Sequence, residues 1–224
     1  MAEPAVRLPA PAAEPDRDCA LCPRLKAFRD ANRAALPDYF NAPVPSFGPH
    51  DAKLLIVGLA PGLHGANRTG RPFTGDWAGD LLYATLQKLG LAHGTYDERP
   101  DDGLTLVGCR IINSVRCVPP QNKPLPQEIA TCNQFLKSEI AVLTGEGGAK
   151  AMLALGAIGH AAALTALGEK KSAFPFAHGA RHALKCGLTL VDSYHCSRYN
   201  TNTGVLTPEM FENAVGAAKE AAGL

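Results

Sequence analysis

The sequence lacks an excess of charge, long apolar runs and an abundance of aromatic side chains. Its 224 residues carry 22 Lys and Arg against 21 Asp and Glu, a net charge of +1 that excludes a strongly basic, histone-like binder. Any contact with nucleic acid must then come from a local patch. The longest apolar runs, such as residues 151–159, fall far short of the ~20 residues that span a bilayer, and no early run resembles a signal peptide. We therefore expect a cytoplasmic protein.

Little in the composition calls for disulfide bonds, although the chain has seven cysteines. With 46% hydrophobic, 6% aromatic and 19% charged residues, the composition is typical of one globular domain. A chain of this length buries roughly 70% of its unfolded surface, enough for stability without crosslinks. In a reducing compartment, cysteines are more typical of metal ligands, catalytic groups or buried thiols.

Short apolar runs alternate with amphipathic segments along the chain. Residues 1–18 are rich in Ala, Pro and charge and predict a disordered tail, followed by a single domain over 19–224. The pattern predicts an α/β fold with a parallel sheet covered on both faces and functional loops after the carboxyl ends of its strands. Strands are expected within 53–62, 104–118, 149–156 and 188–195, and helices within 19–36, 76–91, 126–143 and 207–222. In the second helix, Trp77 falls on the apolar face together with Leu82 and Leu86.

Four cysteines have spacing suited to one metal centre. Cys19 and Cys22 form a C-x2-C pair, whereas Cys117 and Cys132 are separated by 14 residues that include the Pro-rich loop VPPQNKPLPQE. Structural zinc sites usually show two short pairs, while thiolate ligation of a [4Fe–4S] cluster tolerates uneven spacing. Spacing alone leaves open a cluster, a zinc ion or unligated buried thiols. The remaining cysteines are Cys109 and Cys186, which are expected to be ordinary thiols, and Cys196, which follows a candidate catalytic histidine.

Three loop segments carry a specific resemblance to a known family. They are GLAPGLHGANRTGRPFTGD (58–76), NSVRCVPPQNKP (113–124) and SYHCSRYNTNTG (193–204). Together with the four cysteines in the same order, they resemble the family 5 (B type) uracil-DNA glycosylases, from Cys19 to about Thr207. The resemblance implies a three-layer α/β/α sandwich around a four-stranded parallel sheet and a [4Fe–4S] cluster on these cysteines. It also implies excision of uracil, and of other deaminated bases such as hypoxanthine, from DNA by a monomer associated with the nucleoid.

Base excision requires capture of a flipped base and stabilisation of the departing uracil anion. Phe73 can stack on the base, and the Asn113 amide offers a donor and an acceptor to the uracil edge. His195 can donate a hydrogen bond to uracil O2 as a neutral imidazole. Gly58 and Gly62 allow backbone amides to approach the ligand closely, although a phosphate loop is an alternative that lacks the GK[ST] signature. Core packing, a turn cap and a structural histidine are the plainer roles for these side chains.

Hydrolysis also requires a residue that positions the attacking water. Other glycosylase families place a polar or acidic residue where this chain has Ala60. The B type shares this absence, and the resemblance makes Asp76 the candidate for positioning water. An Asp before an apolar helix is also a natural N-cap, and one side chain can do both.

Cations near the three loops are candidates for phosphate contacts. The resemblance places the third loop in the minor groove, and Cys196 stands there in place of a proline common in related enzymes, which would have fixed the loop dihedral. A nucleic-acid-binding module without catalysis, or a phosphotransfer enzyme using the glycine loop, remain alternatives. The candidate DNA contacts are Arg68, Arg71, Arg116, Lys123, Arg198 and Tyr199.

Overall fold

A five-stranded sheet in the order β4-β1-β5-β7-β6 forms the centre of the computed structural model, which describes residues 12–145 and 148–224. Four strands are parallel: β1 (Leu54–Gly58), β4 (Cys109–Asn113), β5 (Ala151–Leu155) and β7 (Thr189–Ser193). At the edge, β6 (Arg181–Ala183) pairs antiparallel with β7. The expected sheet of four strands is thus corrected to five. The fifth strand, β6, was missed because it has only three residues, two of them polar, and so contains no apolar run.

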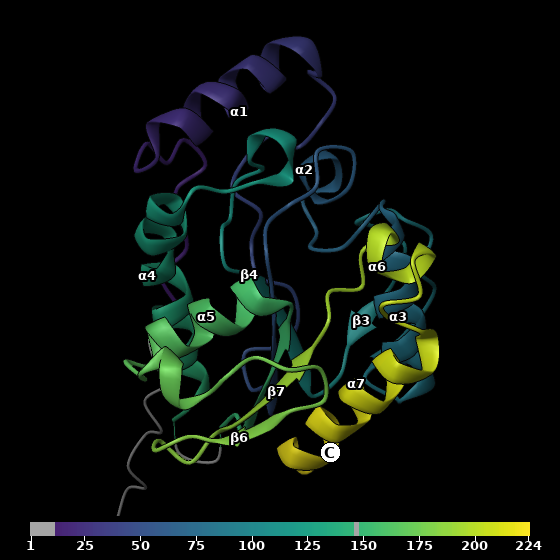
Figure 1. Ribbon diagram of the computed structural model, residues 1–224. Helices are drawn as coiled ribbons and strands as arrows, with labels where there is room; N and C mark the ends of the chain where they lie inside the picture. Colours follow the sequence, from purple (N-terminus) through teal and green to yellow (C-terminus); the bar gives the residue numbers. More distant parts are fainter. Residues whose placement is uncertain (1–11, 146–147) are drawn as a thin grey trace, which may run out of the picture.

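Helices cover both faces of the sheet, which confirms the three-layer α/β/α arrangement (Figure 1). Side chains of the buried strands alternate between two cores: in β1, Leu54 and Ile56 face one core, and Leu55 and Val57 face the other. The first core is closed by α3 (Trp77–Lys88) and α7 (Pro208–Ala222), and the second by α4 (Pro126–Leu143) and α5 (Ala157–Ala166).

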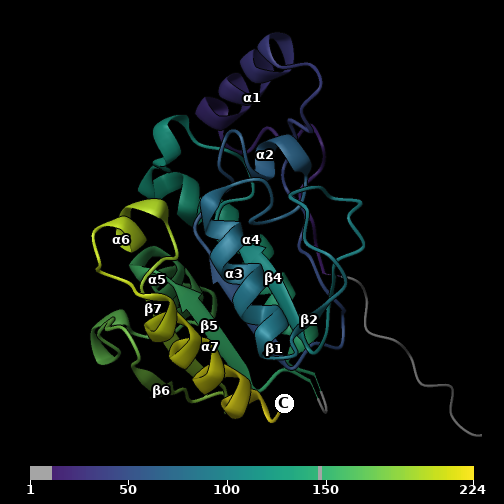
Figure 2. The ribbon, with the colours of Figure 1, turned by 90° about the vertical axis from the view of Figure 1, so that its right-hand side faces the viewer.

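The remaining elements gather around these layers. In both views α1 (Pro23–Ala35) lies across the end of the molecule near α2 (Ala66–Thr69), opposite the C-terminus (Figures 1 and 2). No helix of the described residues is long and apolar enough to cross a membrane. The remaining helices are α1 (Pro23–Ala35), α2 (Ala66–Thr69) and α6 (Arg198–Asn202), with 3-10 turns at Pro120–Asn122 and Lys171–Ala173 and an antiparallel pair of β2 (Ala92–His93) and β3 (Thr105–Leu106).

The expected helices and the four expected strands are present, with shorter strand bounds. The sequence pattern missed α5, because its alanines leave no polar face to reveal a helical period. The assignment of Trp77 to the core face of α3 is wrong, since this side chain is 49% exposed.

The predicted tail lies only partly within the described residues, which begin at residue 12. The amide of Ala13 donates to the Ser138 hydroxyl at 2.7 Å, and Glu14 forms an ion pair with Arg116. Arg33 binds Asp18 at 2.6 Å. These contacts attach residues 13–18 to the domain.

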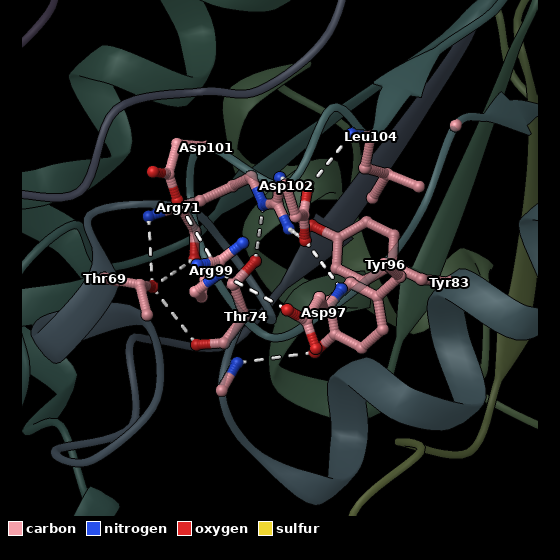
Figure 3. Close-up of polar contacts among 12 residues, drawn as sticks. Thr69, Arg71, Thr74, Tyr83, Tyr96, Asp97, Arg99, Asp101, Asp102 and Leu104 are labelled. Atoms are coloured by element: carbon pink, nitrogen blue, oxygen red, sulfur yellow. Dashed lines mark hydrogen bonds and ion pairs between the residues drawn. The ribbon is translucent and has the colours of Figure 1, made fainter.

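Arg71, a predicted phosphate contact, instead forms a buried ion pair (Figure 3). Its two terminal nitrogens donate to the Asp102 carboxylate at 2.8 and 2.7 Å, and its Nε donates to Thr74 Oγ1 at 2.7 Å. The guanidinium also lies over the rings of Tyr83 and Tyr96. Hydrogen bonding to Arg71 holds the pKa of Asp102 far below its usual range. The DNA-contact assignment of Arg71 is therefore corrected: it joins the loop before α3 to the loop before β3.

We predict that Arg71→Leu lowers the free energy of unfolding by about 3–5 kcal/mol at pH 7, because it leaves the Asp102 carboxylate buried and unpaired. The lowered folded-state pKa makes this stabilisation complete above the unfolded pKa of Asp, about 3.9, and it is lost as the pH falls further. Denaturant unfolding of both proteins at pH 7 and pH 3 measures this. Arg99→Leu, which removes only exposed ion pairs, is the matched control. Equal stability of the Arg71 variant and the wild type would contradict the assignment.

Candidate active site

A cavity of about 650 Å³ opens at the carboxyl ends of the parallel strands, where functional loops were expected. It collects most of the predicted site residues from loops that are far apart in the sequence. Its lining includes Ala60, Gly62, Phe73, Asp76, Asn113, His195, Arg198 and Tyr199.

Gly58 makes room for two of these side chains. It ends β1, directly opposite Asn113 at the end of β4. A Cβ atom on Gly58 would lie 2.4 Å from Asn113 Oδ1 and 2.7 Å from the Phe73 ring, so a larger residue would displace both. Phe73 has a left-handed φ of 52°, which is uncommon for an aromatic residue, and this backbone directs its ring to the cavity wall. The sequence predicted that Gly58 lets the backbone approach the ligand. In the structure, the Asn113 and Phe73 side chains lie in the space at Gly58.

Two buried polar atoms at this cavity have no partner among the described residues: Asn113 Oδ1 and His195 Nδ1. A buried polar atom without a hydrogen bond costs about 1–3 kcal/mol, and so it is rare in folded proteins. The ring of Phe73 lies 6.0 Å from that of His195, between centroids, at an interplanar angle of 30°. A flat ligand with polar edges can satisfy both atoms.

His195 lies in the loop after β7, and the surrounding fold fixes its position. Its carbonyl accepts from Asn200 Nδ2 at 2.8 Å. Gly156 lies beside it with a φ of 90°, which favours glycine, and a Cβ there would be in ordinary van der Waals contact with His195 Cβ at 3.4 Å. Burial lowers the pKa of His195 to about 4. The imidazole is therefore neutral at pH 7, as the sequence reasoning required for a hydrogen-bond donor.

Asp76 caps α3, which confirms the simpler of its two predicted roles. Its Oδ1 accepts from the amide of Gly79 at 3.2 Å. Its Oδ2 faces the first loop, where a Cβ on Gly65 would lie only 2.3 Å away and one on Gly62 3.1 Å away. Burial raises the pKa of Asp76, while backbone N–H groups at the helix end partly offset this. One oxygen thus serves the helix and the other lies toward the cavity.

The candidate DNA contacts divide into three groups. Arg198 and Tyr199 line the cavity, and Arg68 and Lys123 are exposed outside its lining. Arg116 is buried, donates to Val44 O at 2.7 Å and to the Ser46 hydroxyl at 3.0 Å, and pairs with Glu14. Its assignment as a phosphate contact is corrected, as for Arg71, because its guanidinium is already bonded inside the fold.

Some residues of the cavity were missed by sequence reasoning. Trp77 was assigned to the core, and Ile158 lies at the start of the unpredicted α5. The one signal in the sequence for Tyr194 was its position next to His195. The additional lining residues are Leu59, Ala66, Trp77, Ala78, Asn122, Leu155, Gly156, Ala157, Ile158, Phe176, Tyr194, Ser197 and Asn200.

The four predicted metal ligands, Cys19, Cys22, Cys117 and Cys132, line a separate, small cavity of about 20 Å³. In the described ranges, the one group of three ligand atoms within 4.8 Å of one another is His160, His182 and Asp192, so no three cysteine sulfurs come so close. Tetrahedral zinc with Zn–S bonds of ~2.3 Å would bring sulfurs to about 3.8 Å from one another. The spacing thus suits a group larger than one zinc ion.

Two hydrogen-bond donors approach these sulfurs. Arg29 is buried, donates to Cys117 Sγ at 3.5 Å and to the carbonyl of Cys19 at 2.8 Å, and its Nε has no partner. The amide of Arg116 donates to Cys132 Sγ at 3.3 Å. No salt bridge of Arg29 occurs among the residues described here. A buried guanidinium without a carboxylate fits a negatively charged group held between the thiolates.

Comparison with known proteins gives a consistent picture. The family model of the uracil DNA glycosylase superfamily matches residues 45–219. The chain is 46% identical over 211 residues to the type-5 uracil-DNA glycosylase of Thermus thermophilus, covering 92% of this chain and 94% of that protein. It is 41% identical over 213 residues to the type-5 enzyme of Mycobacterium bovis, covering 92% and 79% of the two chains. The type-5 enzyme of Pyrobaculum aerophilum is 36% identical over 210 residues, with 92% and 90% covered.

These matches extend over nearly the whole folded chain and include all three loops of the cavity. The chain belongs to the uracil-DNA glycosylase superfamily.

Proposed function

We propose that this protein is a DNA glycosylase that flips uracil out of DNA and hydrolyses its N-glycosidic bond. The observation that carries the proposal is the pair of unpartnered buried atoms, Asn113 Oδ1 and His195 Nδ1, beside Phe73 in the cavity. Relatives that match 92% of the chain are named as uracil-DNA glycosylases. The cavity volume of about 650 Å³ supports acceptance of larger deaminated bases, such as hypoxanthine, as well.

Each side chain has a separate task in this reaction. The flipped base stacks on Phe73, and the Asn113 amide pairs with the uracil N3–H and the adjacent carbonyl oxygen. As the glycosidic bond breaks, the electron pair moves into the uracil ring, and neutral His195 donates a hydrogen bond to the O2 oxygen where charge builds up. Burial keeps this imidazole neutral, so the site does not bear the desolvation free energy of a buried charged histidine.

Asp76 is the acidic group available to the sugar and to the attacking water. Its Oδ2, which faces the first loop, can orient a water molecule and accept its proton, or stabilise the positive charge of the sugar. The adjacent Ala60 lines the cavity but has no polar atom for this purpose. DNA reaches the cavity across Arg198 and Tyr199, and one copy of the chain supplies all these groups.

We also propose that the four cysteines hold a [4Fe–4S] cluster. The small cavity that they share, the spread of their sulfurs and the buried Arg29, whose Nε has no hydrogen-bond partner, support this. When bound, the cluster would supply a negatively charged crosslink between α1, the loop after β4 and α4. Val115, which packs in the same cluster of side chains as Cys117, is two residues from Asn113, so this crosslink would support the base-binding loop.

An assay for uracil excision distinguishes this function from that of a binding module without catalysis. A uracil-containing oligonucleotide should be cleaved after alkali treatment of the wild-type product. Asp76→Asn keeps an N-cap of equal quality and removes the carboxylate, so we expect about 100-fold slower single-turnover excision with DNA affinity retained.

Asp76→Ser, another good N-cap, is the control for helix stability, and it should be as slow as Asp76→Asn. Asp76→Ala should lose about 1 kcal/mol of stability in addition. Full activity of the Asn variant would show that the cap is the sole role of Asp76.

We predict a pH-dependent stability from His195. Its folded pKa of about 4 lies below the unfolded value of about 6.5, so the unfolded state binds the proton first as pH falls. Between pH 6.5 and 4, His195 should therefore reduce the free energy of unfolding by about 3 kcal/mol, a loss that His195→Asn should not show. Denaturant unfolding across this range measures it, and equal slopes for both proteins would contradict the buried neutral imidazole.

For the cluster, we predict about four iron and four sulfide per chain in protein purified without oxygen. Cys117→Ser should lose iron and folded yield together, because metal binding and folding are linked. Cys186→Ser, at an exposed thiol outside the cavity, is the matched control and should keep both. One zinc per chain with no iron would contradict the proposal.

A further inference from the structure

Trp77 is the single tryptophan of the chain and lies at the entrance to the cavity. It is the first residue of α3 and directly follows Asp76, which faces the reaction centre. Although its position predicted a core contact, it is 49% exposed. A half-exposed indole at a ligand cavity leaves a large apolar surface open to solvent.

The indole is held in one orientation from α6. Its Nε1 donates to Thr201 Oγ1 at 2.9 Å, and the Arg198 guanidinium carbon lies 5.7 Å from the ring centroid. These contacts fix the ring before any ligand arrives, which lowers the entropy cost of binding. They also place a positive charge over one face of the ring. Both properties suit a nucleic-acid strand, which carries aromatic bases and negatively charged phosphates.

Two more apolar side chains are exposed at the same cavity. Tyr199 is 74% exposed and Ile158 is 39% exposed, and both line the cavity together with Trp77. We call these three residues the apolar rim. Because one phosphate group joins successive nucleotides, a base seated in the cavity brings its neighbours in the strand to this rim. The occupant that continues from the cavity is therefore DNA.

We infer that Trp77 is a stacking platform for the nucleobase next to the one that is excised. The inference rests on the proposed glycosylase function and adds a preference for the form of the DNA substrate. A neighbouring base can turn onto the indole when it is unpaired, whereas in a duplex it is held by its partner and its stack. The platform therefore favours single-stranded or locally opened DNA.

The test uses the emission of this single tryptophan. An oligonucleotide with an abasic analogue at the target position binds without being cleaved. A second oligonucleotide also lacks the base on one side of the target, and a third lacks the base on the other side. In single-stranded form, the first oligonucleotide should quench Trp77 emission. One of the other two should fail to quench it, because it lacks the base that stacks on the indole.

Affinities give the second readout. Base–aromatic stacking predicts that Trp77→Ala weakens single-strand binding at least about fivefold and duplex binding less. Removal of the stacked neighbouring base should weaken wild-type binding by the same factor and should cost the Trp77→Ala protein nothing further. Additive losses from the two changes would overturn the inference.

Further variants separate stacking from a merely structural role. Trp77→Phe keeps an aromatic face and should retain most of the affinity. Thr201→Val removes the acceptor of the indole N–H but leaves the ring, so a loss as large as that of Trp77→Ala would show that Trp77 only anchors α6 and would overturn the inference. Val107→Ala changes an exposed apolar residue at the opposite end of β4 and should leave affinity unchanged.

The two proposals fail separately. If wild-type protein excises uracil but shows no coupling between Trp77 and a neighbouring base, the platform is wrong and the glycosylase stands. If the coupling is present and uracil is not excised, the platform stands as a DNA-binding surface and the proposed catalysis is wrong.

Discussion

The close approach of β1 and β4 at their carboxyl ends is the constraint on which the site depends. The two strands are in parallel register, so Gly58 is paired with Asn113. The pairing continues beyond the strands, where the Ser114 amide and hydroxyl donate to the Gly58 carbonyl at 2.9 and 2.7 Å. The missing side chain at Gly58 is what lets the Asn113 amide and the Phe73 ring occupy the same end of the sheet. A methyl group at this position would displace both, and because Phe73 packs in the first core it would disturb that core as well.

This register also connects the site to the cysteines. After Ser114, the Val115 amide donates to the Leu59 carbonyl at 2.9 Å, and Cys117 follows two residues later in the small cavity. The base-binding amide and a proposed cluster ligand therefore lie on one short segment held against the first loop. A crosslink at Cys117 would act on Asn113 through these backbone hydrogen bonds. Its effect on the site is expected to be positional, since the two cavities share no lining residue.

The sequence predicted most of the layers and the side chains assigned to base binding, because both depend on local patterns. Apolar periods located α3, α4 and α7, and loop motifs located Phe73, Asn113 and His195. Arg71 and Arg116 were misassigned because a sequence does not reveal whether a cation meets a buried carboxylate such as Asp102. That pairing joins residues 31 positions apart, and only the folded chain brings them together.

Trp77 was misjudged for a related reason, whereas the predicted N-cap role of Asp76 is confirmed. The helical period assigned Trp77 to the core face, but at the first position of α3 no preceding turn covers it, and α6 holds it instead. The same helix end needs a capping oxygen from Asp76, whose other oxygen faces the first loop. One carboxylate thus contributes both to helix stability and to the chemistry of the site. Replacements that cap equally well can separate the two contributions, since the cap needs any good acceptor, whereas proton transfer needs a group that can hold a proton.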